Sequence, residues 1–316
     1  MDVLTPARPE TSGRTTLALA AAVLSGAVVA VQQRVNGELG VELEAPLLAA
    51  LVSFGTGLLA VVVVVVCRPH ARAAVGRIRD VPWWSRFAGL GGASLVAVGA
   101  FAAPQIGVAL LTIGLVAGQT GGGLVVDRIG LAPGGSHLLT LPRLAGAALC
   151  LFAVALGSLG RDARDADPLL LVLVVGAGFL IALQQAFNGR VRRTTGNAAV
   201  ATLLNFVVGT VALTVGVLLA TLVGGLPDGA WPGPDEWYLY LGGPMGATFV
   251  AVAAVVVRLL GVLRLGLAVI AGQLVGAVAV DLVLPATDGG IAVTTVVGAL
   301  LTFLAVGVSG LGARRR

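Results

Sequence analysis

The chain contains no lysine, and charged residues make up only 11% of its 316 positions. Soluble domains carry roughly 25% charged residues, because their surfaces face water. Hydrophobic residues make up 57% of this chain, and its mean hydropathy is +1.00. So few charges cannot cover a soluble particle of this size, and most of the exterior must therefore face lipid.

Other absences exclude whole classes of function. The basic residues are all arginines strung out between apolar runs, and no soluble domain carries an arginine patch interleaved with aromatic residues, so we expect no nucleic-acid partner. The two cysteines, Cys67 and Cys150, have no partner spacing and predict neither a metal site nor a disulfide framework. Because Ser, His and Asp are not grouped and no nucleotide-binding motif is present, we expect neither an enzyme nor a cofactor.

Ten apolar runs are long enough to be membrane-spanning helices, since a span needs about 20 such residues. The runs are too long and too continuously apolar to be strands of a barrel. They lie at 15–36, 45–67, 83–103, 106–127, 138–158, 169–188, 198–223, 237–258, 263–284 and 291–312. The sequence thus predicts an all-α integral membrane protein, with its least defined boundaries around Pro104, where almost no polar loop separates two runs.

The arginines predict the orientation of these spans. If the N-terminus is cytoplasmic, all arginines except Arg34, Arg161 and Arg164 fall on the cytoplasmic side, as basic loop residues do in membrane proteins. Both termini are then cytoplasmic, with an N-terminal tail at 1–14 and a basic C-terminus at 313–316. We therefore expect a multi-pass protein of the plasma membrane.

The second half of the chain repeats the first. Gln32 and Asn36 recur 152 residues later as Gln184 and Asn188. Farther along the offset is 154, and there Gly118, Gln119, Gly122 and Asp127 correspond to Gly272, Gln273, Gly276 and Asp281. This predicts two five-span units, 15–160 and 161–312. Because five is odd, the second unit enters the membrane inverted, an arrangement that in transporters frames a site near the midplane.

The repeated amides are the candidate substrate-binding residues, because an amide in a span needs a partner and can both donate and accept hydrogen bonds. Gln119 and Gln273 lie in the middle of spans four and nine, where both would face one central cavity or else join helices. Gln32 with Asn36, and Gln184 with Asn188, share helical faces near span ends. These four would line the mouths of a pathway or anchor the helix ends.

Two further matched sets have other interpretations. Asp127 and Asp281 lie at span ends, where they would couple or gate transport, or merely cap a helix or pair with an arginine. Gly118, Gly122, Gly272 and Gly276 have the Gly-x-x-x-Gly spacing that lets helices approach closely. They predict packing of span four against span nine, or contact in a homodimer.

The motifs resemble those of a known family. Gln-x-x-x-Asn-Gly at 32–37 and 184–189, Phe54 and Phe206, and Gly-Gln-x7-Asp at 118–127 and 272–281 are similar to the YdcZ-like family of bacterial inner-membrane proteins. That family belongs to the drug/metabolite transporter superfamily, whose EamA-like fold has two inverted five-helix repeats, so this chain resembles a fused pair of units. The resemblance implies an exporter in the bacterial inner membrane.

Two functions follow as hypotheses. The first is a secondary transporter that exports a small polar metabolite or drug-like solute by alternating access. The alternative is a non-transporting membrane scaffold or assembly protein held by helix–helix contacts. The expected partners are the lipid bilayer, a small-molecule solute and, through the glycine pairs, a second copy of the chain.

Overall fold

The computed structural model describes residues 10–157, 168–224, 229–283 and 293–311, which are helical almost throughout and contain no strand. The first half holds α1 (Glu10–Glu42), α2 (Pro46–Cys67), α3 (Pro69–Val75), the 3-10 helices η1 (Gly76–Asp80) and η2 (Trp83–Phe87), α4 (Gly89–Ile129) and α5 (Leu141–Gly157). The second half holds α6 (Pro168–Thr195), α7 (Ala198–Gly224), the 3-10 helix η3 (Pro234–Leu241), α8 (Gly242–Val283) and α9 (Val293–Gly310).

The exterior of this bundle is apolar. Five of the described helical stretches are long and apolar enough to cross a membrane, and their outward faces carry bare aliphatic side chains. Leu222 and Val223 at the end of α7, for example, are 82% and 93% exposed. Water would penalise such a surface, whereas lipid tails do not. The protein is therefore an integral, multi-pass membrane protein.

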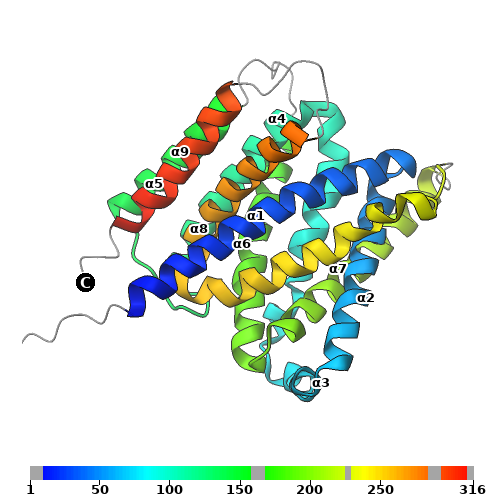
Figure 1. Cartoon of the computed structure of the whole chain (residues 1–316), viewed down its shortest axis with the longest axis horizontal. Coiled ribbons are helices and arrows are strands. Elements are labelled where there is room, and N and C mark those ends of the chain that lie inside the picture. The colour runs from blue at the N-terminus through cyan, green and yellow to red at the C-terminus, as the bar shows by residue number, and fades with distance from the viewer. Residues whose placement is uncertain (1–9, 158–167, 225–228, 284–292, 312–316) are drawn as a thin grey trace, which may run out of the picture.

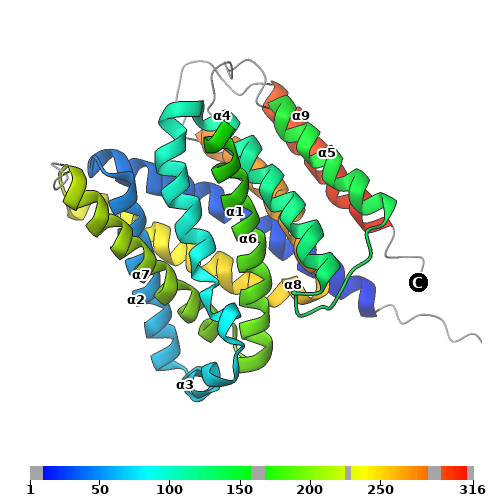
Figure 2. The same ribbon diagram turned by 180° about the vertical axis from the view of Figure 1, so that it is seen from behind.

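The helix α4 contains two of the predicted spans. Its 41 residues would measure about 60 Å if straight, roughly twice the thickness of a bilayer core. Figures 1 and 2 show instead that α4 rises, turns back at its middle and descends. The boundary between the two predicted spans, expected to be poorly defined around Pro104, thus lies within one continuous helical segment. The helix begins at Gly89 instead of residue 83, because Trp83–Phe87 forms a separate 3-10 turn.

The helix α8 likewise joins two predicted spans without a loop. Helical geometry fails at one residue, Gly261, with φ of 73° and ψ of 170°, and the helix resumes in a new direction. Glycine is required there, since this backbone region is essentially closed to residues with a side chain. Within the described residues, α4 and α8 thus each combine two of the predicted spans, and α1, α2, α5, α6, α7 and α9 each correspond to one.

Each half of the molecule packs against the other through its glycines. Gly118 of α4 lies against the backbone of Val175 in α6, and Gly272 of α8 lies in the same way against Val23 in α1. Gly122 and Gly276 extend these two contacts by one turn. The sequence predicted packing of span four against span nine through these four glycines; their faces contact α6 and α1 instead. The two repeats are therefore interlocked, because α4 packs against α6, the first helix of the second repeat, and α8 packs against α1, the first helix of the first repeat.

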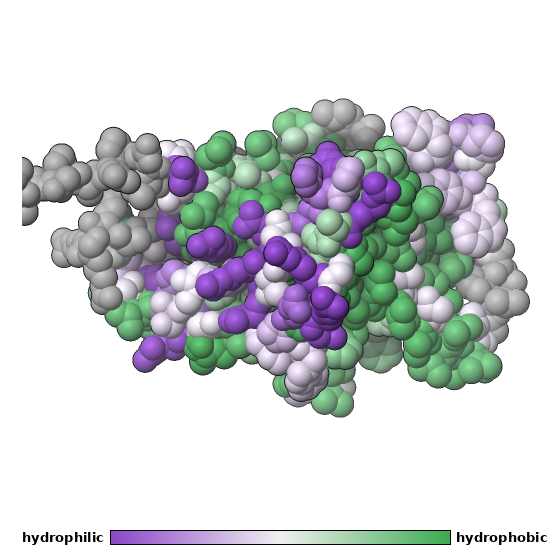
Figure 3. All heavy atoms as spheres, turned by 90° about the horizontal axis from the view of Figure 1, so that it is seen from below, coloured by the Kyte–Doolittle hydropathy of each residue, from purple (hydrophilic) through white to green (hydrophobic). Residues whose placement is uncertain are grey.

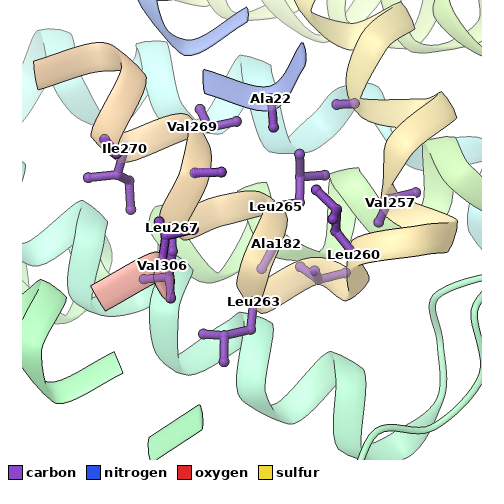
Figure 4. Packing of buried hydrophobic residues seen from close by; sticks show 14 of the residues in the cluster. Ala22, Ala182, Val257, Leu260, Leu263, Leu265, Leu267, Val269, Ile270 and Val306 are labelled. Atoms are coloured by element: carbon purple, nitrogen blue, oxygen red, sulfur yellow. The ribbon is translucent and has the colours of Figure 1, made fainter. Parts of the chain in front are cut away.

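The apolar core gathers around the second half of α8. Leu263, Leu265 and Leu267 are each at most 1% exposed. They pack with Ala22 of α1, Ala182 of α6 and Val306 of α9 (Figure 4). This core holds the central helices in place, while α5 and α9 pair at the edge of the bundle (Figure 1).

One end of the bundle carries most of the described charge. The short helices α3 and η1 place Arg72, Arg77 and Arg79 there, all exposed, next to the end of α6 with Arg192 and Arg193. Figure 3, which looks at the lower side of Figure 1, shows hydrophilic side chains gathered between apolar flanks. We refer to this side, where α3 lies and α6 ends, as the arginine-rich end.

Candidate functional site

A cavity of about 150 Å³ lies between the two repeats. Helices α1, α2, α4, α6, α7 and α8 all contribute to its wall. Its polar lining residues are Gln32, Gln33, Asn36, Ser53, Gln184 and Asn205, and its larger apolar ones are Phe54, Leu95, Ile181, Phe206 and Phe249. No charged side chain is among the described residues that line it. The site is thus a pocket with amide groups and aromatic rings but no fixed charge.

The cavity lies on the axis that relates the two repeats. Phe54 and Phe206 occupy equivalent positions 152 residues apart, and their rings are in contact, with centroids 5.1 Å apart and planes tilted by 34°. Each ring also fills the space left by a glycine of the other repeat, Phe54 against Gly209 and Phe206 against Gly57. Equivalent residues can touch each other in this way only where the axis passes between them.

Gln32 and Gln184 face each other's repeat across the same cavity. The carboxamide of Gln32 lies over Gly246 of α8, and that of Gln184 lies over Gly91 and Gly92 of α4. Gly92 and Gly246 are themselves equivalent, 154 residues apart. A side chain at either glycine would occupy the space of the amide. These glycines therefore leave room for the two carboxamides that are candidate solute-binding groups.

The symmetry fails at the next turn of the helices. Asn188 donates a 2.9 Å hydrogen bond from Nδ2 to Oδ1 of Asn205, and both side chains are almost fully buried. In the first repeat the equivalent pair is Asn36 and Ser53, and the Oδ1 of Asn36 is buried without a hydrogen-bond partner. Asn36 lines the cavity and Asn188 does not. The cavity therefore extends farther toward the end opposite the arginine-rich end.

Aromatic and basic side chains pack together between the cavity and the arginine-rich end. The rings of Trp84 and Phe187 are in contact at 5.1 Å, and the guanidinium carbon of Arg190 lies 5.2 Å from the Trp84 ring centroid. Arg190 also donates hydrogen bonds to the carbonyl oxygens of Gly130 and Leu131, at 3.3 and 2.9 Å from Nη2. These contacts tie α6, η2 and the loop after α4 together below the Asn188–Asn205 hydrogen bond.

Asp127 lies in a separate structural cluster near this end. Its carboxylate accepts a hydrogen bond from the buried Arg143 of α5. It also accepts hydrogen bonds from the backbone N–H groups of Val262 and Leu263, at 2.7 and 3.1 Å, which open the second half of α8 after the break at Gly261. Asp127 thus pairs with an arginine and caps the start of a helix, which is the structural one of the two roles considered for it. Its counterpart Asp281 is in α8, and its side chain lies outside the described residues.

His137 belongs to the loop beside this cluster. Its backbone N–H donates a 2.8 Å hydrogen bond to the carbonyl oxygen of Asp127. Burial lowers the pKa of His137 below its usual value, and the positive charges of Arg143 and Arg264 lower it further against the opposing effect of the Asp127 carboxylate. Protonation of the imidazole is therefore less favourable in the folded protein than in an unfolded chain.

The structure separates the predicted amide residues into two groups. Gln32, Asn36 and Gln184 line the cavity, and Asn188 closes one side of it. Gln119 and Gln273, expected to face a central cavity, are not among its lining residues; Gln119 lies against Gly266 of α8. Sequence reasoning missed the glycines beneath the amides, although Gly92 and Gly246 repeat at the 154-residue offset and could have been found by it.

Comparison with solved structures shows the same fold elsewhere. A structure titled "Crystal structure of protein" superposes with a TM-score of 0.70 and covers 96% of this chain and 98% of its own, at 18% sequence identity. Such a low identity shows the fold alone. No protein of curated function matches the sequence.

A family model carries more information than these structural likenesses. The model described as "Putative inner membrane exporter, YdcZ" matches the chain twice, over residues 17–156 and 169–308. The two matches correspond to the two inverted repeats, whose equivalent residues meet at the cavity. The chain therefore belongs to the YdcZ family of the drug/metabolite transporter superfamily, as a form with both repeats in one polypeptide.

Proposed function

We propose that this protein is a secondary transporter that exports a small polar solute by alternating access through the cavity between its repeats. The observation that carries the proposal is the position of this cavity on the axis between two inverted units, with Phe54 against Phe206 and Gln32 opposite Gln184. The membership of this chain in a family described as inner-membrane exporters supports the same conclusion.

The closure at one end supports alternating access. The Asn188–Asn205 hydrogen bond and the Trp84–Phe187–Arg190 contacts hold the helices together toward the arginine-rich end, while the equivalent positions Asn36 and Ser53 form no such hydrogen bond toward the other end. Because the repeats have the same fold and opposite orientations, exchanging their local conformations would seal the other end and open this one. One chain then has two states of related structure.

The distribution of arginine supports the orientation. We place the arginine-rich end in the cytoplasm, since basic residues accumulate on that side of membrane proteins. α1 begins and α9 ends on this side of the bundle (Figure 1), so both termini are cytoplasmic in this proposal. The described state then faces outward.

The glycine contacts argue against the scaffold hypothesis. Gly118, Gly122, Gly272 and Gly276 are all used for packing within one chain, and a Cβ added at any of them would meet backbone or side-chain atoms of α1 or α6. They are therefore not available as a surface for a partner, and the feature that suggested a scaffold or a homodimer is explained by the fold.

Labelling of a cysteine placed in the cavity tests the proposal. In a Cys67→Ser and Cys150→Ala background, Ser53→Cys is the conservative choice, because Ser53 lines the cavity. A membrane-impermeant maleimide should label this variant from either face, in right-side-out and in inside-out vesicles, since each state exposes the cavity to one side. Labelling from a single face under all conditions would contradict alternating access and favour a static scaffold.

A further inference from the structure

The two equivalent glutamines of the cavity differ in which of their amide atoms are free to bind a solute. Gln32 places its Nε2 nearest to Gly246, with its Oε1 about 1 Å farther from the position of a Cβ there (2.5 against 3.5 Å). Gln184 instead places its Oε1 against Gly91 and Gly92, where this oxygen is buried and has no hydrogen-bond partner. Among the described residues, no hydrogen bond occupies either amide atom of Gln32, so its carbonyl oxygen and its NH₂ group are both available to a solute, whereas Gln184 offers its NH₂ group.

Asn205 adds a second donor beside Gln184. Its Oδ1 is occupied by the hydrogen bond from Asn188, so its own NH₂ group is the part that remains available to the cavity. One side of the cavity thus offers an acceptor and the other offers two donors. A group that donates and accepts side by side, such as a carboxamide, lactam or urea, complements this arrangement.

The remainder of the cavity excludes charged and large solutes. No ionised side chain lines it within the described residues, and transferring an unpaired charge out of water carries a large free-energy cost. The rings of Phe54 and Phe206, together with Phe249, form its apolar wall. Its volume of about 150 Å³ equals that of an engineered apolar cavity that accepts benzene. The solute therefore has about the size of a substituted benzene ring.

From these observations we infer the substrate class: a small neutral solute that carries an amide or lactam group on a compact, flat apolar body. This inference rests on the proposed transport function, because it assigns the cavity as the solute site. It concerns binding, however, and binding can be measured without transport.

A set of four probes of nearly equal size isolates the chemistry of the group. Purified protein in detergent is heated with benzamide, which is neutral and has the amide, or with benzoate, benzylamine or toluene, which are respectively anionic, cationic and apolar at pH 7. A ligand that binds the folded state raises the melting temperature. We expect benzamide to raise it by several degrees in a saturable manner, and the other three to have no saturable effect.

Variants connect the shift to the two glutamines. Gln184→Met and Gln32→Met keep the length of the side chain and remove the amide, and each should raise the benzamide concentration for half-maximal effect about tenfold, as expected for a lost hydrogen bond to a buried group. Thr214→Val, an exposed position on α7 outside the cavity, serves as the control and should respond as the unmodified protein does. Two variants are used so that a folding defect in one leaves the test intact.

The outcomes separate this inference from the proposed function. A larger shift with benzoate or benzylamine than with benzamide overturns the neutral amide class and leaves the transporter proposal in place. The absence of a shift with every probe, or a benzamide shift that survives in both glutamine variants, also overturns the inference. Two-sided labelling at residue 53 decides the transport function independently of these results.

Discussion

Asn188 and Asn205 form a buried hydrogen bond of 2.9 Å on one side of the cavity, and their counterparts Asn36 and Ser53 form none on the other. The difference follows from one substitution between the repeats, since serine is too short to replace asparagine in this bond. It offers a way to shift the balance between the two states of the transporter.

Ser53→Asn should stabilise the state that is closed at the end opposite the arginine-rich end. The change restores to the first repeat the asparagine pair of the second, and a net contribution of about 1 kcal/mol corresponds to roughly a fivefold change in population. We expect a cysteine at Gln33 to be labelled more slowly from outside in this variant. Asn205→Ser should have the opposite effect, and unchanged labelling rates in both variants would show that these residues do not control closure.

Arg143→Leu should strongly destabilise the folded protein. The change leaves the Asp127 carboxylate buried without its ionic partner, and breaking a buried pair on one side typically costs about 3–5 kcal/mol. Thermal unfolding monitored by circular dichroism measures the effect. The double variant Asp127→Asn with Arg143→Leu should lose less stability than the sum of the two single variants; strict additivity would mean that the two residues do not interact.

Gly261→Ala should destabilise the protein by about 1–3 kcal/mol through its backbone conformation alone. The added Cβ would also lie 2.9 Å from Oδ2 of Asp127, so it would disturb the cap of the second half of α8. Gly176→Ala is the matched control, because Gly176 is in α6 with nothing within 4 Å of an added Cβ, and alanine favours a helix. The comparison of melting temperatures should show a loss at 261 and none at 176.

His137 should make stability depend on pH below neutrality. Its pKa is lower in the folded protein than in an unfolded chain, so the folded state binds the proton less readily and stability is lost as the pH falls through the unfolded value near 6.5. The charged groups that act on the His137 imidazole are Asp127, Arg143 and Arg264. Melting temperatures between pH 7.5 and pH 5 should fall more steeply for the natural protein than for His137→Gln; parallel curves would contradict this.

The linear order of residues was enough to predict much of the fold. Run lengths and hydropathy predicted the crossings, and the offsets of 152 and 154 residues predicted the duplication that the family match confirms. The Gln32 and Gln184 motifs also pointed to residues that line the cavity. Boundaries were less predictable where a turn needs no polar loop, since α4 folds back and α8 breaks at Gly261 within continuous helical segments.

The sequence by itself thus determined that the chain crosses a membrane in two inverted units, because length and composition of a run decide whether it can be buried in lipid. Only the tertiary structure decided which side chains come together. Gln32 and Gln184 line the same cavity while Gln119 lies elsewhere, and Asp127 pairs with Arg143. In a bilayer the helix faces toward lipid and toward the core are equally apolar, so hydrophobicity does not specify the rotation of a helix. That rotation is set by the close packing of glycine faces such as Gly118 on α6, which exists only in the assembled bundle.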